Sequence, residues 1–130
     1  MKENSILIVD QSRADSDVYR MILAGAGYRC VCANTIDDAR LLIQNVDFAV
    51  VDLSFPKEEL QSFLGECLPT GNYMGTLHED ELCKLDDLQF YKGGVIIDKP
   101  TWAEVLLEQL HESIGAYRSY QQSIDPSLVP

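Results

Sequence analysis

Three short apolar runs stand out in the pattern of hydrophobic and polar positions along this chain. They cover residues 6–9, 48–51 and 95–97, and they consist of Ile, Leu, Val, Ala and Phe. Unbroken apolar runs of this length predict parallel strands that are buried on both faces. A charged residue follows each run: Asp10, Asp52 or the pair Asp98-Lys99. Because parallel strands end at one edge of their sheet, we expect Asp10, Asp52 and Lys99 to converge there.

Segments with helical periodicity lie between these runs. Ser12-x-x-Asp15 and Thr35-x-x-Asp38 resemble N-terminal capping patterns, so we expect a helix after each of them. In the last helix, we expect Trp102 to pack at the start. The remaining helical segments are a short one within 57–70, a polar one over 78–88, and a last one from 101 to about 120.

Two further extended segments complete the pattern. Residues 28–33 predict a strand on which Cys30 and Cys32 point to the same face. Residues 73–76 predict a weaker strand, in which Gly75 leaves room for another group to approach the backbone. The chain therefore divides into five βα units without an internal repeat, which is typical of an α/β domain with a parallel sheet.

Composition narrows the class of protein and its partners. The chain has 130 residues and 46% hydrophobic content, which suits one domain with one core. Its net charge of -11 disfavours a nucleic acid or an anionic membrane as the partner of this domain. The four cysteines form no C-x-x-C pair, and no apolar run is long enough for a signal peptide or a membrane span. We expect reduced thiols and a soluble, cytoplasmic protein.

The order and spacing of three motifs resemble the receiver domain of two-component response regulators, the family that includes the small chemotaxis regulators. The motifs are Ile-Leu-Ile-Val-Asp at 6–10, Val-Val-Asp-x-x-x-Pro at 50–56 and Lys99-Pro100. The resemblance, which spans about residues 5–118, implies a flavodoxin-like fold: a doubly wound, five-stranded parallel sheet of order 2-1-3-4-5 with helices on both faces. We therefore expect a receiver domain over 1–120 and a C-terminal tail or linker over 121–130.

The same resemblance implies roles for individual residues. Asp52 would accept a phosphoryl group from a histidine kinase or a phosphotransfer protein. Lys99 would pair with the phosphoryl oxygens, and Thr76 at the end of the fourth strand would give them its hydroxyl. A carboxylate nucleophile and a fixed cation are the groups that phosphoryl transfer to a protein side chain requires. The chain would act as a phosphorelay signalling domain, with self-catalysed phosphotransfer and dephosphorylation and no other enzymatic activity.

The resemblance also implies a Mg²⁺ site formed by Asp10, Asp52, a backbone carbonyl at Ser54 and the residue after Asp10. Receivers usually carry a second acid at that last position, whereas this chain has Gln11. An amide keeps an oxygen ligand but lacks the negative charge of a carboxylate. The lost attraction to a divalent ion at ~4 Å is on the order of several kcal/mol at an effective dielectric of ~20, before the cost of desolvation is subtracted. We expect weak Mg²⁺ binding.

Phosphorylation would change the surface formed by the helix expected at 78–88, the last strand and the last helix. This surface would contact a downstream protein, an output domain or a second copy of the chain in a homodimer. The alternative is a degenerate pseudo-receiver that serves as a phosphorylation-independent docking module. It is favoured by Gln11, by Ile96 where many receivers have an aromatic residue, and by the short segment between Asp52 and Thr76.

A flavin carrier with the same kind of sheet is a third hypothesis. Such a protein needs a loop rich in Ser, Thr and Gly to hold the flavin phosphate after the first strand. This chain has Gln-Ser-Arg-Ala-Asp at 11–15 instead. The sequence therefore disfavours the flavin carrier relative to the two receiver hypotheses.

Overall fold

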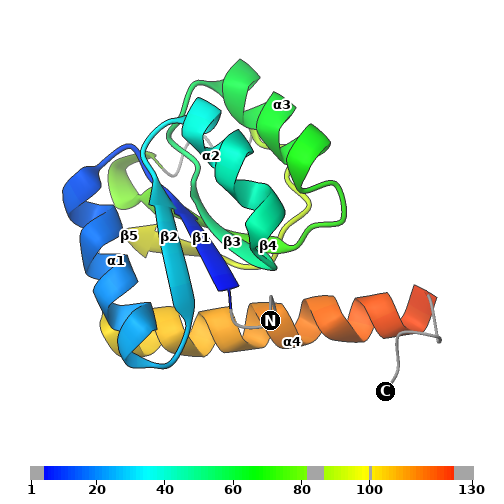
Figure 1. The fold of residues 1–130 in the computed structure, drawn as a ribbon. Helices are drawn as coiled ribbons and strands as arrows, with labels where there is room; N and C mark the ends of the chain where they lie inside the picture. Colours follow the sequence, from blue (N-terminus) through cyan, green and yellow to red (C-terminus); the bar gives the residue numbers. More distant parts are fainter. Residues whose placement is uncertain (1–4, 82–86, 100, 125–130) are drawn as a thin grey trace.

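The computed structural model describes residues 5–81, 87–99 and 101–124, and within them strands and helices alternate along the chain (Figure 1). The strands are β1 (Ser5–Val9), β2 (Arg29–Ala33), β3 (Phe48–Asp52), β4 (Tyr73–His78) and β5 (Ile96–Lys99). The helices are α1 (Arg13–Gly25), α2 (Ile36–Leu42), α3 (Lys57–Cys67) and α4 (Ala103–Ile124), and a 3-10 turn, η2 (Ile43–Asn45), extends α2.

The five strands form one sheet in the order β2-β1-β3-β4-β5, and every strand pair is parallel. Helices α2 and α3 cover one face, and α1 and α4 cover the other (Figure 1). The predicted doubly wound, flavodoxin-like fold and its strand order are confirmed.

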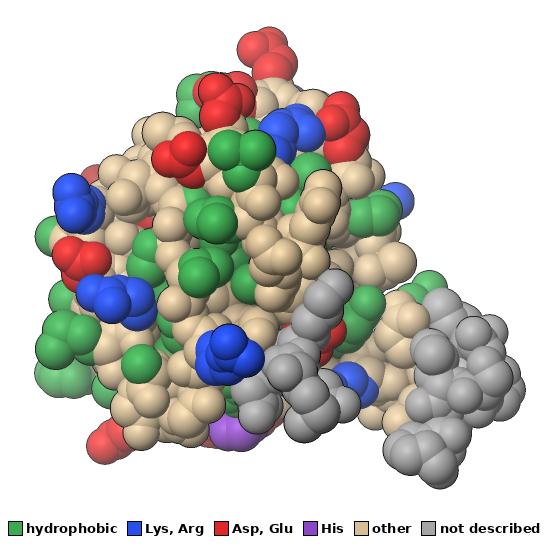
Figure 2. All heavy atoms as spheres, in the orientation of Figure 1, with side chains coloured by type: hydrophobic (Ala, Val, Ile, Leu, Met, Phe, Trp, Pro, Cys, Tyr) green, Lys and Arg blue, Asp and Glu red, His purple; other side chains and the backbone are tan. Residues whose placement is uncertain are grey.

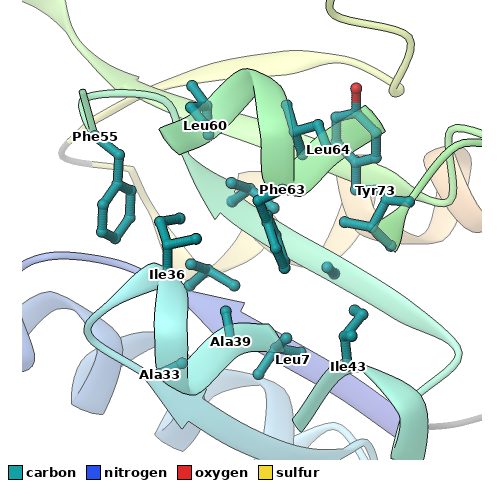
Figure 3. Packing of buried hydrophobic residues seen from close by; sticks show 14 of the residues in the cluster. Leu7, Ala33, Ile36, Ala39, Ile43, Phe55, Leu60, Phe63, Leu64 and Tyr73 are labelled. Atoms are coloured by element: carbon teal, nitrogen blue, oxygen red, sulfur yellow. The ribbon is translucent and has the colours of Figure 1, made fainter. Parts of the chain in front are cut away.

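The two faces of the sheet bury alternate residues of each strand. Leu7, Val9, Ala49 and Val51 pack under α2 and α3, in the cluster seen in Figure 3. Ile6, Ile8, Phe48 and Val50 pack under α1 and α4. Because side chains alternate along a strand, each central strand must be apolar at every position, which is the unbroken pattern found in the sequence.

Both predicted capping patterns form. The Ser12 hydroxyl accepts from the Asp15 N–H at 3.1 Å, and the Thr35 hydroxyl accepts from the Asp38 N–H at 3.1 Å. Each bond satisfies a backbone donor that has no partner within the first helical turn. The approach that Gly75 allows is also found, because a Cβ there would lie 2.7 Å from the Leu53 side chain.

Three predictions for the C-terminal half are wrong or lie partly outside the described residues. The chain over 78–81 is not the start of a helix: His78 pairs with Lys99 in the sheet, and a short 3-10 turn follows at 79–81. The rest of the helix expected there falls mostly on 82–86, outside the described residues. Trp102 does not pack, since it is 81% exposed. Helix α4 runs to Ile124, four residues beyond the predicted end, and extends past the sheet (Figure 1).

The face of the molecule drawn in Figure 2 carries charges of both signs. Figure 2 shows Lys and Arg side chains beside Asp and Glu on one face of the molecule. An ion pair joins α2 to α3, where Arg40 donates to Glu66 at 2.7 Å and to Ser62 at 2.9 Å. In the part of the chain that the structure describes, no helix has the length and hydropathy needed to cross a bilayer.

The cysteines that the structure describes, Cys30, Cys32 and Cys67, are free and partly buried. As predicted, Cys30 and Cys32 lie on the same face of β2, against the cluster under α1 and α4. Burial raises the pKa of the Cys30 thiol to about 11. The reactive thiolate is therefore scarce at neutral pH.

This pKa predicts slow alkylation of Cys30 in the folded protein. At pH 8 only about 0.1% of a thiol with a pKa of about 11 is ionised, so its rate with iodoacetamide should be on the order of 100-fold below that of a free cysteine. Peptide mapping by mass spectrometry measures the rate, and the urea-unfolded protein serves as the control. A folded rate equal to the unfolded rate would show that this strand does not shield the thiol.

Candidate functional site

Four polar side chains lie at the carboxyl edge of the sheet, on the face covered by α1 and α4. Asp10 continues the alternation of Ile6 and Ile8, and Asp52 continues that of Phe48 and Val50. By the same alternation, Thr76 follows Met74 and Lys99 follows Ile97. All four are buried, and the exposed fraction of the whole residue is 1% for Asp10, 2% for Asp52, 1% for Thr76 and 4% for Lys99.

The ammonium group of Lys99 lies among carboxylates. Its Nζ donates to Asp10 Oδ2 at 2.5 Å and lies 3.5 Å from Asp52 Oδ2. A buried ammonium group is costly unless it is paired and hydrogen-bonded, and these two carboxylates provide that compensation. The predicted convergence of Asp10, Asp52 and Lys99 is therefore what the structure has.

Asp10 is held from two sides. Oδ1 accepts from the Ser12 N–H at 2.8 Å, while Oδ2 accepts from Lys99. Burial raises the pKa of the Asp10 carboxyl, and the hydrogen bond from Lys99 opposes this shift. Its backbone is fixed as well, because the Asp10 carbonyl accepts from Asn34 Nδ2 at 2.8 Å and its N–H donates to the Ala33 carbonyl at 3.0 Å.

Asp52 is oriented by the residues that follow β3. Oδ1 accepts from the Ser54 N–H at 3.0 Å and from the Ser54 hydroxyl at 2.7 Å. Oδ2 makes longer contacts, with the Gln11 N–H at 3.4 Å and with Lys99 at 3.5 Å. One carboxylate oxygen is thus firmly fixed, and the other is more loosely held.

Gln11 extends this hydrogen-bonded chain. Its Nε2 donates to the Ser54 hydroxyl at 3.0 Å, and that hydroxyl in turn donates to Asp52. The Gln11 amide oxygen is then the group left to accept a hydrogen bond or bind a cation. The residue that departs from the usual receiver pattern is therefore connected to Asp52 through one serine.

The Thr76 hydroxyl differs from its neighbours. Thr76 is the register partner of Asp52, and its carbonyl accepts from the Leu53 N–H at 2.9 Å. Its Oγ1 is buried and has no hydrogen-bond partner among the described residues. An unpaired buried hydroxyl costs about 1–3 kcal/mol, so its presence beside Asp52 requires an explanation.

Sequence reasoning missed Asp15 as a member of this site. Its spacing from Ser12 indicates only a capping pattern at the start of α1, yet its Oδ2 lies 3.7 Å from Lys99 Nζ, with the side chain 40% exposed. Burial raises the pKa of the neighbouring Tyr19 hydroxyl, and the negative charges of Asp10, Asp15 and Asp52 raise it further. No signal in the sequence alone links residue 15 to residue 99.

One surface hollow includes Lys99 in its lining. A pocket of about 380 Å³ is lined by His78, Glu79, Asp80 and Lys99. It lies beyond the end of β4, where His78 pairs with Lys99.

The predicted Mg²⁺ ligands fit the ion chemically. Among the described residues, no three His, Cys, Asp or Glu side chains form a ready metal cage. Mg²⁺ does not require one, because it usually binds one or two carboxylates and keeps several water molecules. Asp10, Asp52, Gln11 and the Ser54 carbonyl all offer oxygen atoms in this part of the structure, with the Lys99 ammonium already bound to Asp10.

Comparisons with known proteins give similarity at the level of structure. No protein-family model matches the sequence, and no curated protein matches it. A CheY-like response regulator receiver domain protein from Methanospirillum hungatei JF-1 is 24% identical with a TM-score of 0.75, over 90% of this chain and 98% of that one. The chemotaxis protein CheY4 from Vibrio cholerae is 20% identical with a TM-score of 0.72, over 84% of this chain and 97% of that one.

The same fold also occurs within a longer protein. NtrX from Brucella abortus is 17% identical with a TM-score of 0.81, and the match covers 93% of this chain and 28% of NtrX. These similarities extend over nearly the whole sheet and its helices, at low sequence identity. The chain therefore has the fold of the CheY-like response regulator receiver domains, as its sequence motifs predicted.

Proposed function

We propose that this chain is a phosphoacceptor signalling domain in which Asp52 receives a phosphoryl group from a histidine kinase or a phosphotransfer protein. The observation that carries the proposal is the burial of Asp10, Asp52, Thr76 and Lys99 at one edge and on one face of a receiver-type sheet. A structural role alone would not require an unpaired hydroxyl beside two carboxylates and a lysine.

In the proposed reaction, Asp52 Oδ2 forms a bond to phosphorus while the bond from phosphorus to the donor imidazole nitrogen breaks. The imidazole nitrogen then takes up a proton. Oδ2 is the better candidate for attack because its contacts are longer than those of Oδ1 and because Lys99 lies beside it. Ser54 would hold Oδ1 in place, which keeps the carboxylate oriented during the transfer.

The charges that develop on the phosphoryl oxygens require compensation. The Lys99 ammonium group, now paired with Asp10, would also form an ion pair with these oxygens. The Thr76 hydroxyl, which has no partner among the described residues, would donate a hydrogen bond to them. Mg²⁺, held by Asp10, Asp52, Gln11 and the Ser54 carbonyl, would supply positive charge to the same oxygens when bound. The phosphorylated site would then change a surface that a downstream protein or output domain recognises.

A docking module that does not use phosphorylation is the second candidate. Two observations favour it: the neutral Gln11, and the satisfaction of both Asp52 oxygens by hydrogen bonds or ion pairs within the chain. Such a network stabilises the fold without any ligand. Direct phosphorylation separates the two candidates.

Incubation with acetyl phosphate and Mg²⁺ should add the mass of one phosphoryl group, and peptide mapping should locate it on Asp52. Asp52→Asn should abolish the gain because an amide is not a nucleophile of this kind. Asp98→Asn is the matched control, since Asp98 lies near the end of β5 but is exposed, and it should be labelled as the wild type is. A wild type that gains no mass, and whose NMR spectrum does not respond to beryllofluoride with Mg²⁺, would contradict phosphoacceptor function and favour the docking module.

The buried ion pair between Lys99 and Asp10 should contribute to the free energy of unfolding. Lys99→Met should lower the free energy of unfolding by about 3–5 kcal/mol, because it leaves Asp10 buried without its partner. The double variant Asp10→Asn/Lys99→Met should recover much of this loss, since neither member of the pair then carries a charge. Urea unfolding of the wild type, both single variants and the double variant measures the coupling. Additive effects would show that the two side chains do not stabilise each other.

A further inference from the structure

Asp15 is a third carboxylate at the edge where Asp10 and Asp52 lie. Its distance to Lys99 Nζ, 3.7 Å, is close to the 3.5 Å of Asp52. An acid in the first turn of a helix stabilises the helix dipole whichever way it points, so the dipole alone does not explain this direction. Asp17 on the same helix instead lies beside Arg20, at 3.9 Å and 51% exposure.

The charge balance of the edge depends on this residue. Lys99 contributes one positive charge, and Asp10 and Asp52 contribute two negative charges, so the buried groups alone are only weakly anionic. Asp15 raises the total to three carboxylates within 4 Å of one ammonium group. That is the balance of a receiver with a second acid after the first strand, here produced with a neutral Gln11.

Thr76 independently indicates that a ligand belongs here. Its hydroxyl is 1% exposed, lacks a partner among the described residues, and lies on the same face and edge as Asp52 and Lys99. A hydroxyl donates as well as accepts, so it suits an oxygen-rich ligand brought to this edge. The acidic side chains are therefore not merely a solvated cluster.

We propose that Asp15 supplies the negative charge that Gln11 lacks and thereby sets the affinity of this edge for a divalent cation. The inference rests on the proposed function, because it concerns the cation of the same site. Asp15 is 40% exposed, whereas the side chains of Asp10 and Asp52 are 2% and 3% exposed. Asp15 is therefore the most exposed of the three carboxylates, and its charge would act on a bound cation through the water molecules that Mg²⁺ retains.

Binding of Mn²⁺ followed by electron paramagnetic resonance, with Mg²⁺ as competitor, tests this role without phosphorylation. Asp15→Asn should weaken Mn²⁺ binding on the order of tenfold, because the substitution removes one negative charge near the divalent ion in a partly solvated site. Asp17→Asn removes the same charge from the same helix and should change the affinity by less than about twofold. Thermal unfolding without metal checks that both variants fold.

The double variant Gln11→Asp/Asp15→Asn moves the charge to the position usual in receivers, and it should regain most of the affinity that Asp15→Asn loses. Equal affinities of the wild type and Asp15→Asn would overturn the role of Asp15 and leave the proposed function standing. Equal losses of Mn²⁺ affinity in Asp15→Asn and Asp17→Asn would show that only the net charge of the protein matters, and would also overturn the role of Asp15. A wild type that binds neither Mn²⁺ nor Mg²⁺ would overturn both the inference and the metal-dependent function.

Discussion

The buried ammonium group of Lys99 is the constraint on which the arrangement of polar groups at the carboxyl edge of the sheet depends. Its partner Asp10 follows β1, and Lys99 ends β5, so the ion pair joins two strands that are not neighbours. Between them lie the ends of β3 and β4, which carry Asp52 and Thr76. An ammonium group with 4% exposure is costly to bury unless it is paired, and Asp10 and Asp52 provide that pairing at the ends of β1 and β3. The fold therefore gathers its four polar groups by electrostatics as well as by strand geometry.

The sequence predicted those parts of the structure that follow from local periodicity. Unbroken apolar runs predicted β1 and β3, because a strand that is buried on both faces must be apolar at successive positions. The charged residues after the runs then predicted that Asp10, Asp52 and Lys99 share one edge of the sheet. The end of β4 was less predictable, since the polar residues from His78 onward suit a helix or a strand equally well, and the pairing with Lys99 decides between them. The exposure of Trp102 does not follow from its sequence position, because apolar character alone does not say whether a neighbour is present to cover it.

Tertiary geometry accounts for what the sequence left out of the site. Asp15 has the spacing of a capping residue, and only the three-dimensional fold brings its carboxylate within 3.7 Å of Lys99 Nζ. Likewise, the bond from Gln11 to the Ser54 hydroxyl connects two loops that are distant in the chain. The substitution of an acid by Gln11 thus has two consequences that composition cannot separate: a lost charge, and a gained donor that fixes Ser54 and, through it, Asp52. The role that a motif implies for a residue therefore also depends on the side chains that contact it in the folded structure.

Helix α4 begins shortly after Lys99, packs Leu106 and Leu110 against the sheet, and then continues past it. With 22 residues it is a rod of about 33 Å. Because the helix is this long, a tilt of about 5° at its first turn would displace its last turn by about 3 Å. A spectroscopic label near Ser123 would therefore register a tilt of α4 more strongly than a label near its first turn.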